Sequence, residues 1–477
     1  MKKCFFGIDI GTQGVRVILV DQDGIVIASK AKSFTLEENF REEQSPEIWW
    51  DDCYQLISAI MSGLSSDFDR TSIVAAAVTS TSGTVIPLGM DNVPIHDAIM
   101  YSDPRSIEQG KRMNELASQY VPHGYTGFNA SSGISKMLWY MDTFPDRVDD
   151  ISLWAHASDY IVGKLSGNYR HTDFTNVLKS GYDLDSLRWP DYLFEQTGLR
   201  RKWMQEVVPS GSVVGQLRQE LAAGWGMPAI AIVVGITDGC ASQVASGAVR
   251  PGDWNTTIGT TLVIKGVTLS PVVDPLGRLY NHRHPEGYWM PGGASNTGAD
   301  WISLDFGTDL EELSLAADAL IPTGLVAWPL KQQGERYPIM APQARAIIPE
   351  TDSISQRYAA NLEGVAFIER LAYEMITELS GEQLDVVYTA GGGSNSDVWL
   401  RIRSAVLGVP IYKCKEASGA LGAAIMAASQ TWYGSLTEAA KAMTSVEKRV
   451  IPDKILVEAY NKQYQLFKDK LKALKYI

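Results

Sequence analysis

The chain has 477 residues, of which 45% are hydrophobic and 20% charged, and Lys plus Arg (42) against Asp plus Glu (55) leave a net charge of −13. This length exceeds what one hydrophobic core usually organises, so we expect two domains with a cleft between them. The negative charge argues against a surface for nucleic acid or for an anionic membrane.

No segment has the features of a targeting or membrane-spanning sequence. The chain begins MKKCFFGID, and Asp9 interrupts the apolar run before a secretory core could form. The longest nearly apolar run, residues 227–236, is too short to cross a bilayer. The cysteines lie far apart and form no CxxC pair, at Cys4, Cys53, Cys240 and Cys414. These features favour a reduced, cytoplasmic protein without a structural zinc site.

The first third of the chain alternates strand and helix signals. Residues 5–10, 15–20 and 24–29 read as three strands joined by the turn sequences GTQG and DQDG. A helix is predicted over 45–60, with Ser45 as N-cap and Pro46 at the first helical position. Residues 72–80 have the continuous apolar pattern of a strand buried in a parallel sheet. This order predicts an α/β domain.

The pattern restarts near residue 228. AIAIVVGITDG is a buried strand with a polar end, and residues 253–267 form two strand-like runs around Gly259–Thr261. Ile10-Gly11-Thr12 recurs there as Ile258-Gly259-Thr260, which indicates an internal duplication, although a chance match of three residues is the alternative. Residues 384–412 then have the pattern of a strand, a glycine turn, a helix and a second strand. Residues 457–474 have the pattern of a terminal amphipathic helix, which we expect to pack against the rest of the protein.

Three glycine-rich turns are candidates for phosphate binding, because glycine lets backbone N–H groups approach phosphate oxygens closely. They are Gly11–Gly14, Gly259–Thr261 and Gly391–Gly393. Each could also be an ordinary turn. Neither GxxxxGK[ST] nor an opening GxGxxG is present, so hairpins would have to bind the phosphate.

Two aspartates stand at the ends of predicted strands. Asp9 precedes the first glycine turn, and Asp238 follows the strand 230–236. Such charges cost free energy unless partnered. Asp238 could be a helix N-cap and Asp9 a turn residue, yet ligands also bind at the carboxyl ends of strands in open α/β sheets. In a phosphotransferase one carboxylate would accept a proton and the other would hold hydrated Mg²⁺.

Other polar residues leave their roles open. His282 and His284 fall in NHRHPEGYW, which we interpret as a surface hairpin. Asp103, Arg105 and Lys136 lie among apolar neighbours and are either buried pairs or pocket walls.

Thirteen stretches, spread over essentially the whole chain, form one recognisable set. They are FFGIDIGTQGVR, TSTSGTV, YSDPR, SKMLWY, SDYIVGKLSG, TDFTNVLKSGYD, GITDGCASQVASG, TTIGTT, GYWMPGGASNTGADW, GERYP, NLEGVAFIERL, TAGGGSNSDVW and EASGALGAA. Together they resemble the FGGY carbohydrate kinase family, of the actin/hexokinase/Hsp70 superfold. The resemblance implies two duplicated RNase H-like α/β domains around a central cleft. Residues 1–232 would bind sugar, and residues 233–477 would bind ATP and carry a terminal helix that packs back on the first domain.

The same resemblance assigns roles, with ATP and Mg²⁺ as the cofactors. It makes Asp238 the general base and a sugar contact, and it makes Asp9 a carboxylate that touches the sugar and, through water, Mg²⁺, facing Asp238 across the cleft. Ser82 corresponds to a sugar-contacting position. The residues implied to bind the nucleotide are Thr12, Gln13, Gly259, Thr260 and Thr261 on the two hairpins, Gly293 and Thr297 on a loop, and Gly392 and Ser396 at the adenosine-binding turn.

Four of these stretches look most like the D-ribulose kinase branch of the family, namely TSTSGTV, NVLKSGYD, GYWMPGGASNTG and GERYP. That likeness implies conversion of D-ribulose to D-ribulose 5-phosphate. Thr79 stands where that branch would have an aspartate. Alternative substrates are D-xylulose, L-ribulose, glycerol and gluconate. Alternatives of another class are a non-catalytic sugar sensor and a sugar-independent ATPase. The expected partner is a small sugar, without nucleic acid or membrane, for a monomer or homodimer.

Overall fold

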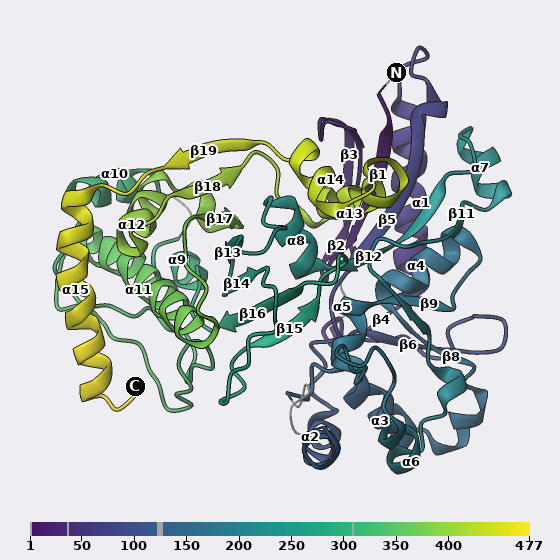
Figure 1. Cartoon of the computed structure of the whole chain (residues 1–477), viewed down its shortest axis with the longest axis horizontal. Coiled ribbons are helices and arrows are strands. Elements are labelled where there is room, and N and C mark those ends of the chain that lie inside the picture. The colour runs from purple at the N-terminus through teal and green to yellow at the C-terminus, as the bar shows by residue number, and fades with distance from the viewer. Residues whose placement is uncertain (1, 36–37, 122–126, 308–309) are drawn as a thin grey trace. The chain divides into compact units, whose positions relative to one another are not determined.

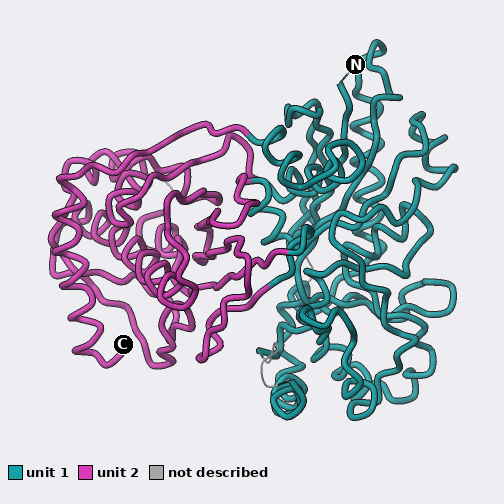
Figure 2. Tube along the Cα trace, in the orientation of Figure 1, with its two compact units in different colours: residues 1–245, 282–287, 418–444 teal, residues 246–281, 288–417, 445–477 magenta. Residues whose placement is uncertain are grey.

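The structure is a computed structural model that describes residues 2–35, 38–121, 127–307 and 310–477. The chain forms two compact units (Figure 2). Unit 1 contains Met1–Ala245, His282–Gly287 and Ser418–Thr444, and unit 2 contains Ser246–Asn281, Tyr288–Ala417 and Ser445–Ile477. Within the described ranges, no helix is both long and apolar enough to cross a membrane.

Unit 1 is built on a six-stranded sheet of order β11-β12-β5-β1-β2-β3 (Figure 1). β1 pairs antiparallel with β2 and parallel with β5, and β5 pairs parallel with β12. Every residue of β1 except Asp9 is buried, because the strand lies in the middle of the sheet. The strands are β1 (Cys4–Ile10), β2 (Gly14–Asp21), β3 (Val26–Ser33), β5 (Ile73–Ser80), β11 (Val213–Gln216) and β12 (Ala231–Thr237). The predicted α/β order of this region is confirmed, with β3 starting later than expected.

Unit 2 repeats this sheet. Its order is β15-β16-β14-β13-β17-β18-β19, and β13 pairs antiparallel with β14 and parallel with β17 as β1 does with β2 and β5. β17 pairs parallel with β18, as β5 does with β12. The strands are β13 (Trp254–Ile258), β14 (Leu262–Gly266), β15 (Tyr280–Arg283), β16 (Trp289–Ser295), β17 (Val387–Ala390), β18 (Ile411–Cys414) and β19 (Val446–Val450). The internal duplication is thereby confirmed.

The helices of unit 1 cover its sheet and two smaller sheets. The four-stranded one has the order β4 (Glu43–Gln44), β7 (Ala98–Ile99), β6 (Val85–Leu88), β8 (Leu153–His156), and β9 (His171–Asp173) pairs in parallel with β10 (Glu206–Val208). The helices are α1 (Pro46–Gly63), α2 (Ile107–Tyr120), α3 (Gly133–Thr143), α4 (Ala157–Ser166), α5 (Phe174–Val177), α6 (Asp191–Thr197), α7 (Gln219–Trp225), α8 (Asp238–Ala245), α13 (Gly419–Ala428) and α14 (Leu436–Met443).

Helix α13 packs on β1 and β5 although it follows β18 in the chain. All of its residues are buried, and its sequence GALGAAIMAA lets it approach the sheet closely. A Cβ atom on Gly7 of β1 would lie 1.8 Å from the Ala420 carbonyl oxygen. Small residues on both elements therefore permit a backbone contact that larger side chains would prevent.

Unit 2 has its core around the long helix α11 (Ile354–Ser380). Its N-cap is Ser353, whose Oγ accepts from Gln356 N–H, and its C-cap is Gly381, with φ 73°. Phe367 of α11 packs against aromatic residues of α15 (Lys454–Ala473), namely Tyr460, Tyr464 and Phe467. The remaining helices are α9 (Asp300–Asp305), α10 (Glu311–Leu320) and α12 (Asp397–Leu407).

Three segments expected in the second domain, residues 233–245, 282–287 and 418–444, belong to unit 1. The first and last of them do so because β12, α8 and α13 pack with β5 and with one another. The terminal helix α15 packs on α12 within unit 2. His282 and His284 are buried, so the surface interpretation of this hairpin was wrong.

Candidate active site

Asp9 lies at the carboxyl end of β1, opposite Arg16 on β2 and beside Thr79 on β5. Its pKa is raised to about 7, chiefly by burial and then by repulsion from Asp238, while Arg16 lowers it. None of the hydrogen bonds among the described residues involves the Asp9 carboxylate. A carboxylate with a raised pKa and no protein donor favours a bound cation or proton.

Asp238 is the first residue of α8 and follows directly on β12. Its Oδ1 accepts from the Gly239 N–H at 2.6 Å, a bond to the next residue in the chain and not to the N–H two or three residues on that an N-cap side chain binds. That bond does not explain why a second carboxylate, Asp9, lies so close to Asp238 that Asp238 raises its pKa. Both residues belong to unit 1, whereas the sequence interpretation placed them on different domains. The reason is that β12, β5 and β1 are neighbours in one parallel arrangement, so their carboxyl ends meet at one edge.

Gly419 is a site residue that sequence reasoning missed. A Cβ atom there would lie 2.6 Å from Asp9 Oδ2 and 3.2 Å from Oδ1. The first turn of α13 therefore abuts the Asp9 carboxylate, and a side chain at position 419 would displace that carboxylate. EASGALGAA carried the signal as a run of small residues, but nothing in the sequence connected it with Asp9.

The first glycine turn joins β1 to β2, with Gly11 N–H donating to the Gly14 carbonyl at 2.9 Å. Thr12 is held on both sides, since its hydroxyl donates to Tyr101 Oη at 3.3 Å and Gln44 Nε2 donates to its carbonyl at 2.9 Å. The Gln13 side chain is exposed. Tyr101, in YSDPR, is a second residue whose part in the turn the sequence did not reveal.

Ser82 follows β5 in the loop TSTSGT. Its hydroxyl is buried and has no hydrogen-bond partner among the described residues, whereas the neighbouring Thr81 and Thr84 hydroxyls bond each other at 3.0 Å. Thr84 also accepts from Tyr101 N–H at 3.1 Å. The loop is thus fixed around a hydroxyl that the protein itself leaves unsatisfied.

Lys136 and the Asp103–Arg105 pair are structural in this arrangement. The Lys136 ammonium is fully buried, its Nζ donates to the carbonyls of Asp103 and Ala130, and burial lowers its pKa to about 8. Arg105 donates to Asp103 at 3.0 Å and to Glu43 Oε1 at 2.6 Å. These contacts support a partly buried ion pair for Asp103 and Arg105, whereas Lys136 is buried against backbone carbonyls.

The second glycine turn, in unit 2, joins β13 to β14. Gly259 N–H donates to the Thr261 carbonyl at 3.0 Å, and Ala299 N–H donates to the Gly259 carbonyl at 2.8 Å. Thr260 is exposed. A Cβ atom on Gly298 would lie 2.3 Å from the Thr260 carbonyl oxygen, so the loop after β16 supports this turn closely.

Gly293 and Thr297 lie beneath that turn and are buried. The Tyr337 ring covers Gly293, where a Cβ atom would lie 2.2 Å from the ring. The Thr297 hydroxyl donates to Glu335 Oε2 at 3.0 Å and accepts from Trp328 Nε1 at 2.7 Å. Because the Thr297 hydroxyl already bonds two side chains of the protein and Gly293 is covered by a ring, these two residues shape the loop.

The third glycine turn connects β17 to α12. Gly391 has φ 82°, and a Cβ atom there would lie 2.5 Å from the Ile258 carbonyl oxygen, which brings this turn beside the end of β13. Gly392 is exposed with open space around it. Ser396 is the N-cap of α12, where its Oγ accepts from Trp399 N–H at 3.4 Å. The structure thus brings the second and third turns together.

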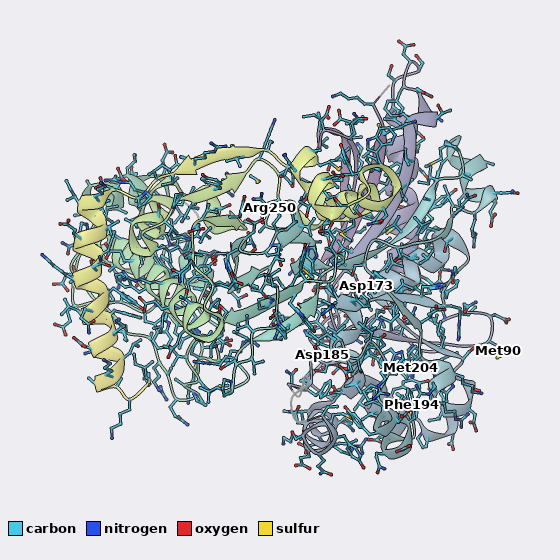
Figure 3. The ribbon with its side chains drawn as sticks, viewed as in Figure 1. Met90, Asp173, Asp185, Phe194, Met204 and Arg250 are labelled. Carbon is cyan, nitrogen blue, oxygen red and sulfur yellow. The ribbon has the colours of Figure 1, made fainter. Side chains whose placement is uncertain are left out.

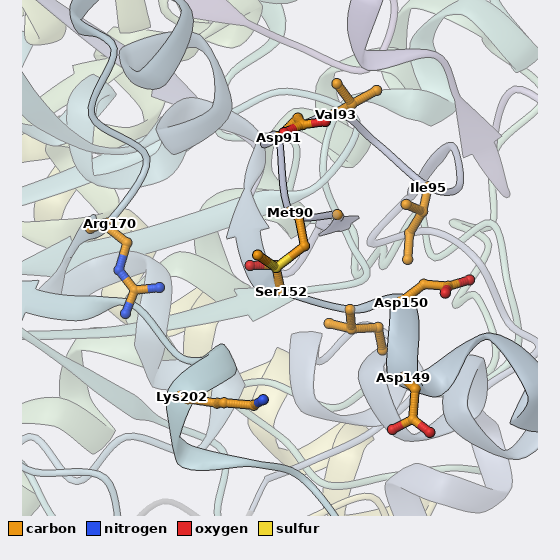
Figure 4. Close-up of a pocket in the computed structure, with 11 residues that line it drawn as sticks. Met90, Asp91, Val93, Ile95, Asp149, Asp150, Ser152, Arg170 and Lys202 are labelled. Carbon is orange, nitrogen blue, oxygen red and sulfur yellow. The ribbon is translucent and has the colours of Figure 1, made fainter.

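Unit 1 also has a cavity of about 710 Å³ that none of the predicted site residues lines (Figure 4). Its wall combines apolar side chains with charges of both signs, the aspartates Asp91, Asp149 and Asp150 and the cations Arg170 and Lys202. The chemistry described above therefore lies outside it.

Solved structures share this architecture over nearly the whole chain. The xylulose kinase of Rhodospirillum rubrum superposes with a TM-score of 0.87, at 24% identity and with 99% of each chain covered. The gluconate kinase of Lactobacillus acidophilus gives 0.86, at 20% identity and with 99% of this chain and 98% of that one covered. The fold is therefore the duplicated, actin/hexokinase-like α/β fold of sugar kinases, as expected.

The sequence comparison defines the family. The N-terminal domain of the FGGY family of carbohydrate kinases matches residues 4–245, and its C-terminal domain matches residues 254–431. The chain belongs to this family and is a phosphotransferase that acts on a sugar. Relatives include the xylulose kinase of Bacillus subtilis (strain 168), 25% identical over 98% of this chain and 96% of that protein, and the gluconokinase of Bacillus licheniformis, 23% identical over 99% and 96%.

Proposed function

We propose that the protein transfers the γ-phosphoryl group of ATP to a hydroxyl of a ketopentose, with D-ribulose as the first candidate. The observation that carries this proposal is the carboxylate pair of Asp9 and Asp238 at the carboxyl ends of β1 and β12. Burial, and then repulsion from Asp238, raise the pKa of Asp9, so the pair suits a site that binds a proton or a cation.

In this proposal Asp238 accepts the proton of the attacking sugar hydroxyl. The sugar oxygen then bonds to the γ-phosphorus while the bond from that phosphorus to the β–γ bridging oxygen breaks, and ADP leaves. Asp9 contacts the sugar, and its carboxylate, which accepts no hydrogen bond from the described residues, suits a hydrated Mg²⁺ ion. When bound, Mg²⁺ would neutralise charge on the phosphate oxygens.

The turns supply the proposed contacts to the nucleotide. Thr12 and Gln13 in unit 1, and Gly259, Thr260 and Thr261 in unit 2, would present amide and hydroxyl groups to the phosphates. The exposed Gly392 and the helix cap Ser396 would adjoin the adenosine, while Gly293 and Thr297 would shape the loop below. Unit 1 would then bind the sugar, with Ser82 offering its unpartnered hydroxyl, and unit 2 would bind ATP.

The choice of D-ribulose rests on TSTSGTV, NVLKSGYD, GYWMPGGASNTG and GERYP. The names of the two relatives make D-xylulose and gluconate the leading alternatives. A coupled assay of ADP release with D-ribulose, D-xylulose, L-ribulose, pentitols, glycerol and gluconate separates them by kcat/KM. A polyol or gluconate that exceeds D-ribulose would contradict the ketopentose assignment and leave the kinase assignment standing.

The general base is tested with Asp238→Asn. Removing a general base lowers kcat by about 10²–10⁴-fold, so we expect a loss in that range in sugar-dependent ADP release. Asp191→Asn is the matched control, because Asp191 is also the first residue of a helix in unit 1 but forms an exposed ion pair with Arg201. Near-normal turnover by Asp238→Asn would remove Asp238 from the mechanism.

A further inference from the structure

A buried carboxylate, Asp173, has no role in the proposed chemistry so far. It lies inside unit 1 at the end of β9 and is 0% exposed (Figure 3). Its partners are hydroxyl and amide groups, and it forms no ion pair with the part of the chain that the structure describes. A buried carboxylate without a counter-ion costs stability, so the groups that it holds deserve a functional explanation.

Asp173 organises the first turn of α5. Its Oδ2 accepts from Thr175 N–H at 2.8 Å, from the Thr175 hydroxyl at 2.7 Å and from the Ser210 hydroxyl at 2.5 Å. Its Oδ1 accepts from Asn176 N–H at 3.2 Å and from Asn176 Nδ2 at 2.7 Å. An ionised carboxylate only accepts, so the Thr175 hydroxyl must point its hydrogen at Asp173 and keep its lone pairs free for another donor.

That other donor is the N–H group of Thr237, 2.8 Å from Thr175 Oγ1. Thr237 is the last residue of β12 and precedes Asp238 directly. The carbonyl of the same peptide, on Ile236, accepts from the Thr79 hydroxyl at 2.5 Å. Side chains therefore bond both polar groups of the Ile236–Thr237 peptide, which directly precedes the peptide bond to Asp238.

These side-chain bonds lie where the strand pairing of β12 is irregular. The register of β12 against β5 shifts between Val234 and Thr237, and Thr237 pairs with Ser80 beyond the shift. Because the ladder is interrupted before Thr237, the side-chain bonds help to fix the direction of the end of β12 and with it the position of the Asp238 carboxylate.

A second arm runs from Asp173 to the end of β5. Asn176 Nδ2 also donates to the Ser158 hydroxyl at 3.0 Å, and Ser158 N–H donates to Ser80 Oγ at 2.9 Å. Ser80 is the last residue of β5, two positions before Ser82. One carboxylate is thus connected to both strand ends that carry the proposed base and the proposed sugar contact.

We propose that Asp173 is a positioning residue for phosphoryl transfer, which acts through Thr175 on the peptide before Asp238 and through Asn176 on the end of β5. The inference rests on the proposed function, because it takes Asp238 as the base. Misplacing a reacting group by about 1 Å can lower a rate by about 10²-fold, so loss of this alignment would reduce kcat more than it reduces ATP binding.

Thr175→Val is the sharpest test, since it keeps the shape of the side chain and removes only the hydroxyl between Asp173 and Thr237. We expect kcat to fall by about 10- to 100-fold with the KM for ATP within about twofold of wild type. Thr175→Ser restores the hydroxyl and is expected to recover most of kcat. Ser210→Ala is the matched control, because it removes a bond to the same carboxylate oxygen without touching Thr237, and its kcat should stay within about threefold of wild type.

Amide hydrogen exchange supplies a measurement that does not depend on turnover. Thr175→Val should accelerate exchange of the Thr237 amide, and Ser210→Ala should not. Wild-type kcat in Thr175→Val, equal losses in Thr175→Val and Ser210→Ala, or unchanged exchange at Thr237 would each overturn the inference. Failure of the proposed function would look different, as wild-type protein without sugar-dependent ADP release or as a fully active Asp238→Asn variant.

Discussion

At the scale of single residues, Asp9 combines a cost in stability with a proposed role in the reaction. Its carboxylate lies in a partly buried place, near Asp238 and against the first turn of α13. The pKa of Asp9 is raised to about 7 from its ordinary value of 3.8, so the folded protein binds the Asp9 proton more tightly than the unfolded chain does. The contribution of this group to stability is full below about pH 4 and is lost as the pH rises to about 7.

Asp9→Asn should therefore make the protein more stable at pH 8 and less active. We expect the free energy of unfolding at pH 8 to rise by about 1–3 kcal/mol, because the neutral amide removes the ionised carboxylate from this site. The gain should vanish near pH 4, and sugar-dependent ADP release should fall at pH 8. Urea denaturation at pH 4 and pH 8 measures the first effect; an equal gain at both pH values would show that ionisation of Asp9 is not its cause.

Other residue assignments could not come from the sequence. Thr297 matched a nucleotide-contacting pattern, yet its hydroxyl is used by Trp328 and Glu335, which are far from it in the chain. Gly419 lies 410 positions after Asp9 in the numbering and still touches its carboxylate. Local patterns identify where a chain turns and which residues are unusual. They do not record which distant side chain satisfies a hydroxyl.

At the scale of elements, the packing of α13 on β1 depends on small residues at the contact. The sequence indicated β1 and β5 correctly, since continuous apolar runs between turn residues are typical of buried parallel strands. It gave no indication that a helix following β18 would cover them. The contact is close because Gly7 has no side chain to separate the strand from Ala420.

Gly7→Ala should destabilise unit 1. Its Cβ atom would lie 1.8 Å from the Ala420 carbonyl oxygen, so α13 or β1 has to move. Overpacking of this kind costs about 1–3 kcal/mol, and backbone on both sides places the expected loss at the upper end. Gly63→Ala is the control, because Gly63 ends α1 with no atom within 4 Å of its Cβ position. Chemical denaturation that gives both variants the same stability would contradict the close contact.

At the scale of the whole molecule, the duplication explains why two glycine–threonine hairpins occur in one chain. Both units place a hairpin beside a parallel strand in the same sheet order. The echo of Ile10-Gly11-Thr12 at Ile258-Gly259-Thr260 is therefore more than a chance match. The two copies have diverged at the chemistry, since Asp9 follows Ile8 in β1 where Thr257 follows Thr256 in β13.

A sugar kinase and a sugar-independent ATPase on this fold differ in what they do without sugar. We expect ADP release by wild type without sugar to be below about 1% of the rate with the preferred sugar, because an oriented sugar hydroxyl has an entropic advantage over water. The measurement is ADP release with Mg²⁺ and ATP alone and then with each sugar. Equal rates with and without sugar would favour the ATPase alternative, and ligand-induced stabilisation without ADP release would favour a sensor.

The sequence by itself determined the family, the α/β class, the duplication and the positions of the strand-end aspartates and glycine turns, because these depend on periodicity and on residues close together in the chain. Only the tertiary structure decided that Asp9 and Asp238 belong to one unit, that α13 covers β1, and that Asp173 is linked through Thr175 to the peptide before Asp238. Those facts depend on sheet order and on hydrogen bonds between distant segments. The order of the strands in the sheet brings segments that are distant in the chain next to one another, and no local sequence pattern specifies which distant segments will be in contact.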